Sequence, residues 1–479
     1  MKNICIPFLL AASVALFNGC ATNPVTGKKQ VVLMSESQEL AMGKEADPQI
    51  VTQFGLYEDA NLQNFIKQKG QEMAAISHRN NIPYEFKIVD SDVINAFAVP
   101  GGYVYFTRGI MAHFNNEAEF AGVLGHEIGH IAARHTVEQQ RNALFSQLGL
   151  IAGIVIAPEL AQFAEAASQG LGLMMLKFGR DAERESDKLG VEYSTKIGYD
   201  AKQMAFFFNT LERQGAKSGS DPLPNILSTH PNPGERLQTV QQLAIDWQRQ
   251  LNLTDPKVNR NSYLQRIEGL IYGEDPKGGY LENNVFYHPE MKFQFATPAG
   301  WAYQNSPQQV QLASKDGKAM MMLTLAQGAS LQEAANAVLT QYKMQVQESR
   351  EVNVNGLRAL AVVADLQQQQ GVLRTLSYFI QQGNVIYHMM GVSAAADFNA
   401  YAPYFSNSMQ SFRELTDASK INKKPERIRI KTVPQSMTLD QALRNFRMPA
   451  NRLEELSILN GMKLTDNVPS GTMIKVIGE

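Results

Sequence analysis

The chain has 479 residues, of which 44% are hydrophobic, so it is long enough for about three packed domains and is neither wholly disordered nor fibrous. Its 44 basic and 46 acidic residues give a formal net charge of −2, which excludes a chain-wide attraction to nucleic acid. The two cysteines, Cys5 and Cys20, both lie in the first 20 residues, which excludes a disulfide framework.

The N-terminus has the pattern of an export signal. A lysine is followed by an almost wholly apolar run over 4–17 and then by a small residue and Cys20, the order found in secretory signals. The run is too short to span a bilayer comfortably. A cysteine directly after the cleavage point resembles the bacterial lipoprotein signal, which implies that residues 1–19 are removed and that the Cys20 thiol is acylated. This resemblance implies a periplasmic protein anchored to a membrane, with Ala21 permitting sorting to the outer membrane. Plain secretion is the alternative.

The sequence pattern of residues 35–250 predicts one helix-rich domain with a small sheet. A Pro- and Gly-bearing segment, 20–34, precedes it and is expected to act as a lipid-anchored tether. Alternating and β-branched residues predict strands within 84–106, whereas the apolar run 148–156 is too short for a membrane span. A helical period predicts helices at 117–147, 180–197, 201–215 and 234–250.

Two changes of composition divide the rest of the chain. Residues 251–285 are rich in Asn, Asp, Gly and Tyr and are expected to form a linker, and residues 415–431 form a second, basic linker. Between them, 286–414 alternates strand-like and helical runs, which predicts an α+β domain with an antiparallel sheet. The predicted strands are 293–296, 320–325, 359–364, 373–380 and 385–390, and the predicted helices are 331–347 and 396–412.

The last segment, 432–479, has a strand, helix, helix, strand (βααβ) pattern. It weakly resembles a LysM-like module, a small fold that holds peptidoglycan in other proteins, and this resemblance implies peptidoglycan as a partner. Its apolar positions are numerous enough to fill a small interior. We therefore expect an independent binding module, separate from the domain at 35–250.

The segment 126–130 reads His-Glu-Ile-Gly-His and carries the clearest chemical signal in the chain. On a helix, positions i and i+4 share one face, so His126 and His130 can bind one metal ion through two imidazole nitrogens. Zinc is the ion that such ligands suit. Glu127 lies about 100° further round the helix. It is therefore not a ligand, but it can take a proton from a metal-bound water.

A catalytic zinc site has three protein ligands and one water, and the continuation typical of metzincins is missing after His130. Downstream, Glu183 and Asp187 lie one turn apart on a predicted helix. Here the sequence resembles the gluzincin zinc metallopeptidases that include HtpX, the CAAX prenyl endopeptidase and BepA, whose motif is Glu-x-x-Ala-Asp. The resemblance implies a mainly α, zincin-like catalytic domain. Glu183 is then the third ligand, and Asp187 holds a ligand imidazole by its other nitrogen. Ser186 replaces the usual alanine.

The resemblance extends over residues 23–245 and implies further site residues. Asn95 and Gly102 flank the strand that, in such metalloproteases, receives the substrate as an added strand. In the soluble branch of the family, the residue that matches His230 lies near zinc, where it either stabilises the oxyanion or blocks the open position. A capping histidine in a Pro-bracketed turn is the structural alternative for His230.

Three other residues near these motifs have structural interpretations. His135 lies off the metal-facing side of its helix, so we expect it behind the ligands or in the core. Arg180 and Arg236 are expected to form salt bridges with the acids of the site, and substrate binding is the alternative for both.

These features predict a multidomain, zinc-dependent endopeptidase of the bacterial cell envelope that binds one Zn²⁺ per chain. Glu127 takes a proton from the metal-bound water and passes it to the leaving amine. The family resemblance implies misfolded or misassembled envelope proteins as substrates, and no nucleic acid is expected as a partner. The alternative from another class is an envelope assembly factor or chaperone whose zinc site is structural or closed by His230.

Overall fold

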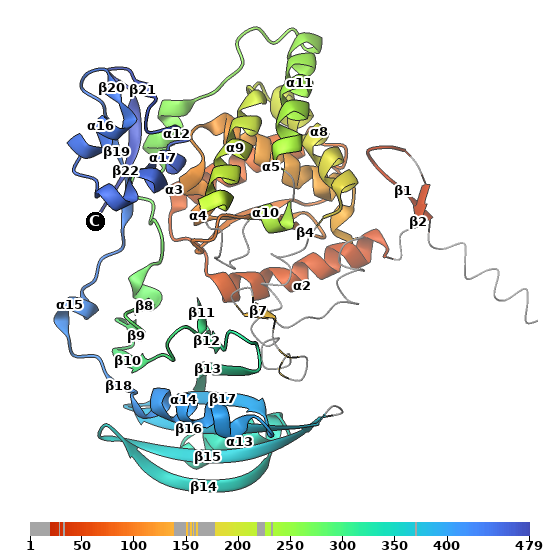
Figure 1. The fold of residues 1–479 in the computed structure, drawn as a ribbon. Coiled ribbons are helices and arrows are strands. Elements are labelled where there is room, and N and C mark those ends of the chain that lie inside the picture. The colour runs from red at the N-terminus through yellow and green to blue at the C-terminus, as the bar shows by residue number, and fades with distance from the viewer. Residues whose placement is uncertain are drawn as a thin grey trace, which may run out of the picture.

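The molecule, seen in a computed structural model, has a helical unit, a β-rich unit below it and a small C-terminal unit beside the helical one (Figure 1). The expected signal sequence, 1–19, and most of the apolar run 148–156 lie outside the described residues. Within the described part of the chain, none of the helices combines the length and the apolar character needed to cross a bilayer. The structure describes residues 20–27, 29–31, 34–137, 150–151, 154–155, 157, 160, 178–217, 226–230, 233–368 and 371–479.

The helical unit (residues 34–272) contains the small sheet that the sequence predicts within 84–106. Its strands lie in the order β3 (Glu85–Val89), β5 (Tyr103–Thr107) and β4 (Ala96–Val99), with β3 parallel and β4 antiparallel to β5. Strand β4 is therefore an edge strand. The helices are α2 (Glu36–Phe54), α3 (Ala60–Ala74), α4 (Arg108–His113), α5 (Glu117–Ala132), α8 (Arg180–Lys196), α9 (Lys202–Lys217), α10 (Ile226–Thr229), α11 (Pro233–Gln250) and α12 (Arg260–Arg266).

Three of the four predicted helices are confirmed by α8, α9 and α11, but α5 is shorter than the predicted helix 117–147. It ends at Ala132 because Arg134 adopts a left-handed backbone with φ of 63°, which an α-helix cannot continue. Residues 138–147 of the predicted helix lie outside the described part of the chain.

A buried ion cluster ties α2 to the end of α5. Glu39 of α2 is fully buried, and its carboxylate oxygens lie 2.6 Å from a guanidinium nitrogen of Arg79 and 2.9 Å from one of Arg134. Both arginines are also buried. Because a buried charge is costly unless it is paired, this cluster fixes how α2 sits on the helical unit.

Helices α5 and α8 cross with their backbones in close contact. A Cβ atom added to Gly125 of α5 would lie 2.9 Å from the carbonyl oxygen and 3.0 Å from the Cα of Gly190 on α8. A Cβ added to Gly190 would in turn lie 3.0 Å from the backbone nitrogen of His126. Only glycines permit this approach, and it sets the distance between the two helices that carry the predicted ligands.

The β-rich unit (residues 276–421) contains an antiparallel seven-stranded sheet in the order β11-β12-β13-β17-β16-β15-β14 and a four-stranded sheet in the order β18-β10-β9-β8. Helix α13 (Leu331–Gln341) packs on one face of the large sheet through Ala334, and α14 (Phe398–Gln410) packs on the other through Phe405. The strands are β8 (Tyr280–Glu282), β9 (Val285–His288), β10 (Phe293–Ala296), β11 (Ala302–Ser306), β12 (Gln309–Ala313), β13 (Ala319–Ala326), β14 (Gln345–Val354), β15 (Leu357–Gln368), β16 (Gly371–Gln382), β17 (Val385–Ala394) and β18 (Arg413–Glu414).

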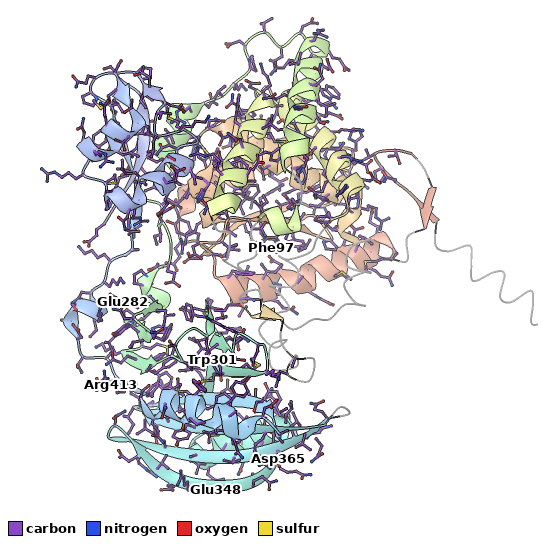
Figure 2. All side chains as sticks on the ribbon, viewed as in Figure 1. Phe97, Glu282, Trp301, Glu348, Asp365 and Arg413 are labelled. Atoms are coloured by element: carbon purple, nitrogen blue, oxygen red, sulfur yellow. The ribbon has the colours of Figure 1, made fainter. Side chains whose placement is uncertain are left out.

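All five predicted strands of this unit are present, but the predicted helix 331–347 is too long. Helix α13 ends at Gln341, Lys343 has a left-handed backbone with φ of 55°, and β14 begins at Gln345. Strand β14 is the outer strand of the large sheet, where Figure 2 labels Glu348, and almost all its residues are exposed. It lacks the alternation of a strand with one buried face, so the sequence pattern does not reveal it.

The C-terminal unit (residues 427–479) has the predicted order of strand, helix, helix and strand. Strand β19 pairs antiparallel with β22, and β19 begins inside the segment 415–431 that was expected to be a linker. The resemblance of this unit to a LysM module stays a prediction. Its elements are β19 (Arg427–Thr432), β20 (Met437–Thr438), α16 (Leu439–Asn445), α17 (Leu453–Leu459), β21 (Asn467–Val468) and β22 (Met473–Gly478).

The C-terminal unit shares one apolar core with the helical unit, so the structure differs from the expected separation. Leu439 and Leu456 belong to the same buried cluster as Tyr263 of α12, within the expected linker 251–285. The two segments also pair through their backbones, since Ile428 N donates to Leu270 O at 2.8 Å. The apolar residues of the tail therefore cover the helical unit as well as filling an interior of their own.

We predict that Gly125→Val weakens metal binding and lowers the free energy of unfolding. The new side chain would push α8 away from α5, and overpacking of this kind costs about 1–3 kcal/mol. Denaturant unfolding and metal titration would measure both effects. Gly179→Ala is the control, because an added Cβ there meets no heavy atom within 4 Å. Equal metal affinity in Gly125→Val and wild type would contradict the role given to this contact.

Candidate metal centre

Helix α5 brings the histidines of the His-Glu-x-x-His motif to one face. Its N-cap residue, Asn116, accepts a hydrogen bond from the backbone N–H of Glu119 at 2.8 Å, which satisfies a free donor at the helix start. Every residue of α5 is buried. The Nε2 atoms of His126 and His130 lie 3.0 Å apart, as the i,i+4 spacing predicts.

Glu183 of α8 and His230, directly after α10, complete a group of four. One ligand atom from each of His126, His130, Glu183 and His230 lies within 4.8 Å of the others. Oε1 of Glu183 is 2.8 Å from Nδ1 of His230 and 3.4 Å from Nε2 of His130. Nδ1 of His230 is 3.2 Å from Nε2 of His126. Tetrahedral zinc ligands at about 2.0–2.1 Å from the ion lie about 3.3 Å apart, so this group fits a zinc ion.

Asp187 and Arg236 hold this group from behind. A carboxylate oxygen of Asp187 lies 3.0 Å from Nδ1 of His126, which leaves the Nε2 of that ring for the centre. The Arg236 guanidinium donates to both oxygens of Asp187 at 2.7 and 2.6 Å, and it lies 2.9 Å from Glu183. The expected salt bridges of Arg236 with the acids of the site are present, and the contact of Asp187 with His126 is the kind that the family resemblance implies.

These contacts set the protonation states of the group. Burial alone would raise the pKa of Glu183, but the charge of His230 and hydrogen bonds from His130 and His230 hold it well below its ordinary value. Burial also opposes ionisation of Asp187, yet Arg236 lowers the pKa of that carboxyl. Burial holds the pKa of His130 well below its ordinary value. Anionic carboxylates and a neutral imidazole are the forms that bind a metal.

A second layer of side chains lies behind His130. Its Nδ1 is 3.2 Å from Nδ1 of His135, whose Nε2 is 3.0 Å from Glu185. The ring of Phe178 stacks on His130 with centroids 3.8 Å apart. His135 thus lies behind the ligand group, which is one of the two positions expected from the sequence. The sequence reasoning missed Glu185 and Phe178, because one more helix acid and a single aromatic residue give no distinguishing pattern.

Glu127 lies beside the group, and its carboxylate makes no hydrogen bond to the described residues. The side chain is fully buried, and neither carboxylate oxygen has a hydrogen-bond partner among the described residues. Nε2 of His230 lies 3.8 Å from Oε1 of Glu127. Burial raises the pKa of Glu127, and the charges of His230 and His126 oppose that shift. Because a buried carboxylate without a partner is costly, this position suits a group that accepts a proton or hydrogen bond from a bound ligand.

Comparison with known proteins agrees with this geometry. Residues 60–244 match the model of peptidase family M48. The chain carries a peptidase family M48 domain. This M48 domain contains α3, α4, α5, α8, α9, α10 and two thirds of α11, and therefore all four members of the ligand group.

Several curated relatives match part of the chain. The beta-barrel assembly-enhancing protease of Escherichia coli (strain K12) is 31% identical over 258 residues, which are 51% of this chain and 52% of that protein. The metalloendopeptidase OMA1 of Arabidopsis thaliana is 32% identical, and the match covers 39% of this chain and 37% of that protein. The metalloprotease YcaL of Escherichia coli (strain K12) is 26% identical, and the match covers 50% of this chain and 97% of that protein. This chain thus spans about half the length of the beta-barrel assembly-enhancing proteases that it matches.

One solved structure that matches is only weakly similar. The cyanobacterial PsbP of Synechocystis sp. PCC 6803 matches with a TM-score of 0.24 at 9% identity, and the match covers 27% of this chain and 91% of that one. This likeness is too weak to support any argument about the M48 domain or the β-rich unit.

The other predicted residues of the M48 domain have clear positions. Asn95 is fully buried directly before the edge strand β4. Gly102 has φ of 96°, and a Cβ there would lie 2.0 Å from the carbonyl oxygen of Pro83, so packing alone requires a glycine. Arg180 is exposed at the start of α8. The backbone N–H of Ile226, the first residue of α10, donates to Ile94 O at 3.0 Å. This bond holds α10, and with it His230, close to Asn95.

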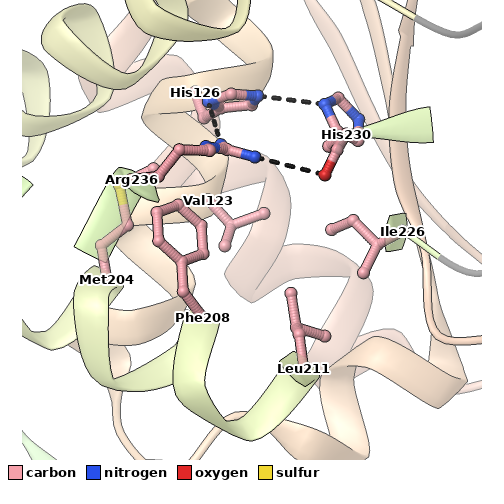
Figure 3. A pocket seen from close by; sticks show the side chains of 8 residues that line it. All are labelled: Val123, His126, Met204, Phe208, Leu211, Ile226, His230 and Arg236. Atoms are coloured by element: carbon pink, nitrogen blue, oxygen red, sulfur yellow. Dashed lines mark hydrogen bonds between the residues drawn. The ribbon is translucent and has the colours of Figure 1, made fainter. Parts of the chain in front are cut away.

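The centre is enclosed by apolar side chains (Figure 3). A cavity of about 10 Å³ lies between His126, His230 and Arg236 on one side and side chains of α9 on the other. This space holds about one water molecule. In Figure 3, the ring of Phe208 lies beside the guanidinium of Arg236, whose central carbon is 4.4 Å from the ring centroid, and the exposed fraction of His230 is 3%.

We predict that Asp187→Ala weakens zinc binding and also destabilises the fold. Loss of such an outer carboxylate typically costs 10–100-fold in metal affinity. It also leaves the buried Arg236 guanidinium without its main partner, which costs about 3–5 kcal/mol. Chelator competition and thermal unfolding would measure the two effects.

Two further variants separate these effects. In the double variant Asp187→Ala/Arg236→Met, the unpaired charge is gone, so part of the stability returns while the affinity for zinc stays low. The control, Asp181→Ala, removes an acid on the same helix whose side chain is 98% exposed. Full recovery of zinc affinity in the double variant would contradict the role of Asp187.

Proposed function

We propose that the chain is a zinc-dependent endopeptidase of the bacterial cell envelope. One observation carries the proposal: His126, His130 and Glu183 converge on a single point, and Glu127 lies beside it with neither carboxylate oxygen hydrogen-bonded to a described residue. Three nitrogen and oxygen ligands with a fourth position left for water are typical of catalytic zinc. The match to peptidase family M48 supports the same activity.

Each residue of the centre has a role in this proposal. His126, His130 and Glu183 would hold the ion, and Asp187 would fix the His126 ring. Bound zinc would lower the pKa of a water and polarise the peptide carbonyl. Glu127 accepts the proton of the attacking water and delivers it to the leaving amine.

The proposed substrates are misfolded or misassembled envelope proteins, with β4 as the strand along which a peptide adds. Relatives named beta-barrel assembly-enhancing proteases support an envelope role. The edge position of β4 beside α5 supports strand addition, because an edge strand offers unpaired backbone groups to a peptide. In this mode Asn95 lies directly before β4, and Gly102 lies in the turn after it.

A second candidate function is an assembly factor whose zinc site is closed. The specific observation in its favour is His230, whose Nδ1 lies 2.8 Å from Glu183 and 3.2 Å from Nε2 of His126. At this position His230 would be a fourth protein ligand and would occupy the place of the water. The cavity of about 10 Å³ beside it also leaves no room for a peptide. In the enzyme, His230 instead moves aside and donates a hydrogen bond to the oxyanion.

Glu127→Gln tests the proposed activity. The variant should bind zinc as wild type does and cleave unfolded casein about 10²–10⁴-fold more slowly, because a positioned general base contributes about that factor. Peptide release and elemental analysis would measure the two properties. Glu45→Gln, an exposed glutamate of α2, is the control.

His230→Ala separates the two candidate functions. If His230 closes the site, this variant gains cleavage over wild type, and the addition of Glu127→Gln abolishes the gain. Absence of casein cleavage by wild type and His230→Ala, with zinc bound in both, would refute the endopeptidase and favour the assembly factor.

We further propose that the mature protein is periplasmic and held at a membrane, more specifically the outer membrane, by a lipid on Cys20. The support is the signal-like pattern of residues 1–19 followed by Cys20. Cys20→Ser should move the protein from the membrane fraction to the soluble fraction without changing its unfolding temperature, because the lipid would be its strong attachment. Retention in a detergent-dependent membrane fraction would contradict the lipid anchor.

A further inference from the structure

A lysine of the last strand lies inside the interface between the C-terminal unit and the helical unit. Lys475 of β22 is fully buried, and its Nζ donates to the carbonyl oxygens of Ala112 at 2.8 Å and Phe114 at 3.1 Å. The oxygen of His113 is 3.5 Å away. These carbonyls end helix α4, where the last oxygens of a helix lack partners within it. A cation at this place also complements the helix dipole.

The same turn between α4 and α5 is held by further contacts from the C-terminal side. Arg260 of α12 donates to Asn115 O at 3.1 Å and to Met473 O at 3.2 Å, which links the turn to β22. Gly461 lies so close that an added Cβ would be 2.9 Å from the Asn115 amide nitrogen. The backbone of Lys475 is fixed in turn by the side chain of Asn460, at 2.7 and 2.8 Å.

The buried amine faces the first turn of α5. Glu119 is buried there, and its carboxylate accepts from the backbone N–H of Asn115 at 2.6 Å. Burial lowers the pKa of Lys475 well below its ordinary value, and the charge of Glu119 opposes that shift. Burial raises the pKa of Glu119 to about 7. Arg260 is the other charged group that acts on both residues. The side chains of Lys475, Glu119 and Arg260 all bond to backbone groups of the same turn, and together they hold it in one arrangement.

This network is continuous with the metal centre through a single helix. Glu119 is in the first turn of α5, and His126, Glu127 and His130 follow on the same helix. Helix α5 is buried along its whole length and packs against α8, which carries Glu183. A shift at the start of α5 is therefore transmitted to the ligands, since a close-packed interior does not absorb it.

We propose that Lys475 is a positioning residue, and that the C-terminal unit clamps the turn 112–116 and thereby sets the place of α5 in the metal centre. The catalytic consequence of this inference rests on the proposed endopeptidase function, but the clamp itself does not. The unit is then part of the working M48 domain and not a separate appendage.

Lys475→Met in the full-length protein tests the clamp, because it keeps the length of the side chain and removes the three donated hydrogen bonds. Lys463→Met, an exposed lysine of the same unit, is the matched control. The readouts are the absorption spectrum of the protein loaded with Co²⁺, the zinc affinity by chelator competition, and amide hydrogen exchange over 112–124. All three are measured well below the unfolding temperature and do not require cleavage of a substrate.

The expected result for Lys475→Met is a changed Co²⁺ spectrum, zinc affinity about tenfold lower and faster exchange over 112–124, with Lys463→Met equal to wild type. A lower unfolding temperature with an unchanged Co²⁺ spectrum would overturn the proposal and leave Lys475 a structural role only. If Lys475→Met does not fold, Arg260→Gln tests the same turn, because Arg260 donates to Asn115 O and is only partly buried. Absence of cleavage by both wild type and His230→Ala would refute the endopeptidase and leave these readouts able to decide the clamp.

Discussion

The metal centre depends on how closely the backbones of α5 and α8 approach each other. Gly125 and Gly190 bring the two helices to a separation that any side chain would increase. At that separation, the carboxylate of Glu183 lies next to the Nε2 atoms of His126 and His130, which are themselves close together. The ligand group thus arises from two rigid elements and one close contact, and the loop residue His230 is added to a frame that is complete without it.

The buried charges of the centre explain why this frame is suited to a dication. When ionised, Glu127, Glu183 and Asp187 carry three negative charges, against the one positive charge of Arg236, and all four side chains are buried. With the histidines neutral, as metal binding requires, two negative charges stay unbalanced in a region with little access to water, and a dication would compensate them. The apolar walls from α9 strengthen this effect because they exclude water from the centre.

The sequence predicted those features that depend on residues close together in the chain. The i,i+4 spacing of His126 and His130, the placement of Glu183 on a helix and the strands within 84–106 are local patterns, and the structure has all of these elements. It could not predict contacts between distant segments, such as Phe178 stacking on His130 or Lys475 reaching the end of α4. The tail shows the same limit: its apolar residues predict a core but do not say whether another unit contributes to it.

The two ends of α5 are held by opposite ends of the chain. After the helix, Arg134 binds Glu39 of the first long helix, and before it the turn at 112–116 meets β22, the last strand. An emerging chain therefore contains the entire ligand group long before it contains the strand that completes the surroundings of α5. The surroundings of α5 are therefore complete only after β22, the last strand that the structure describes, has been synthesised.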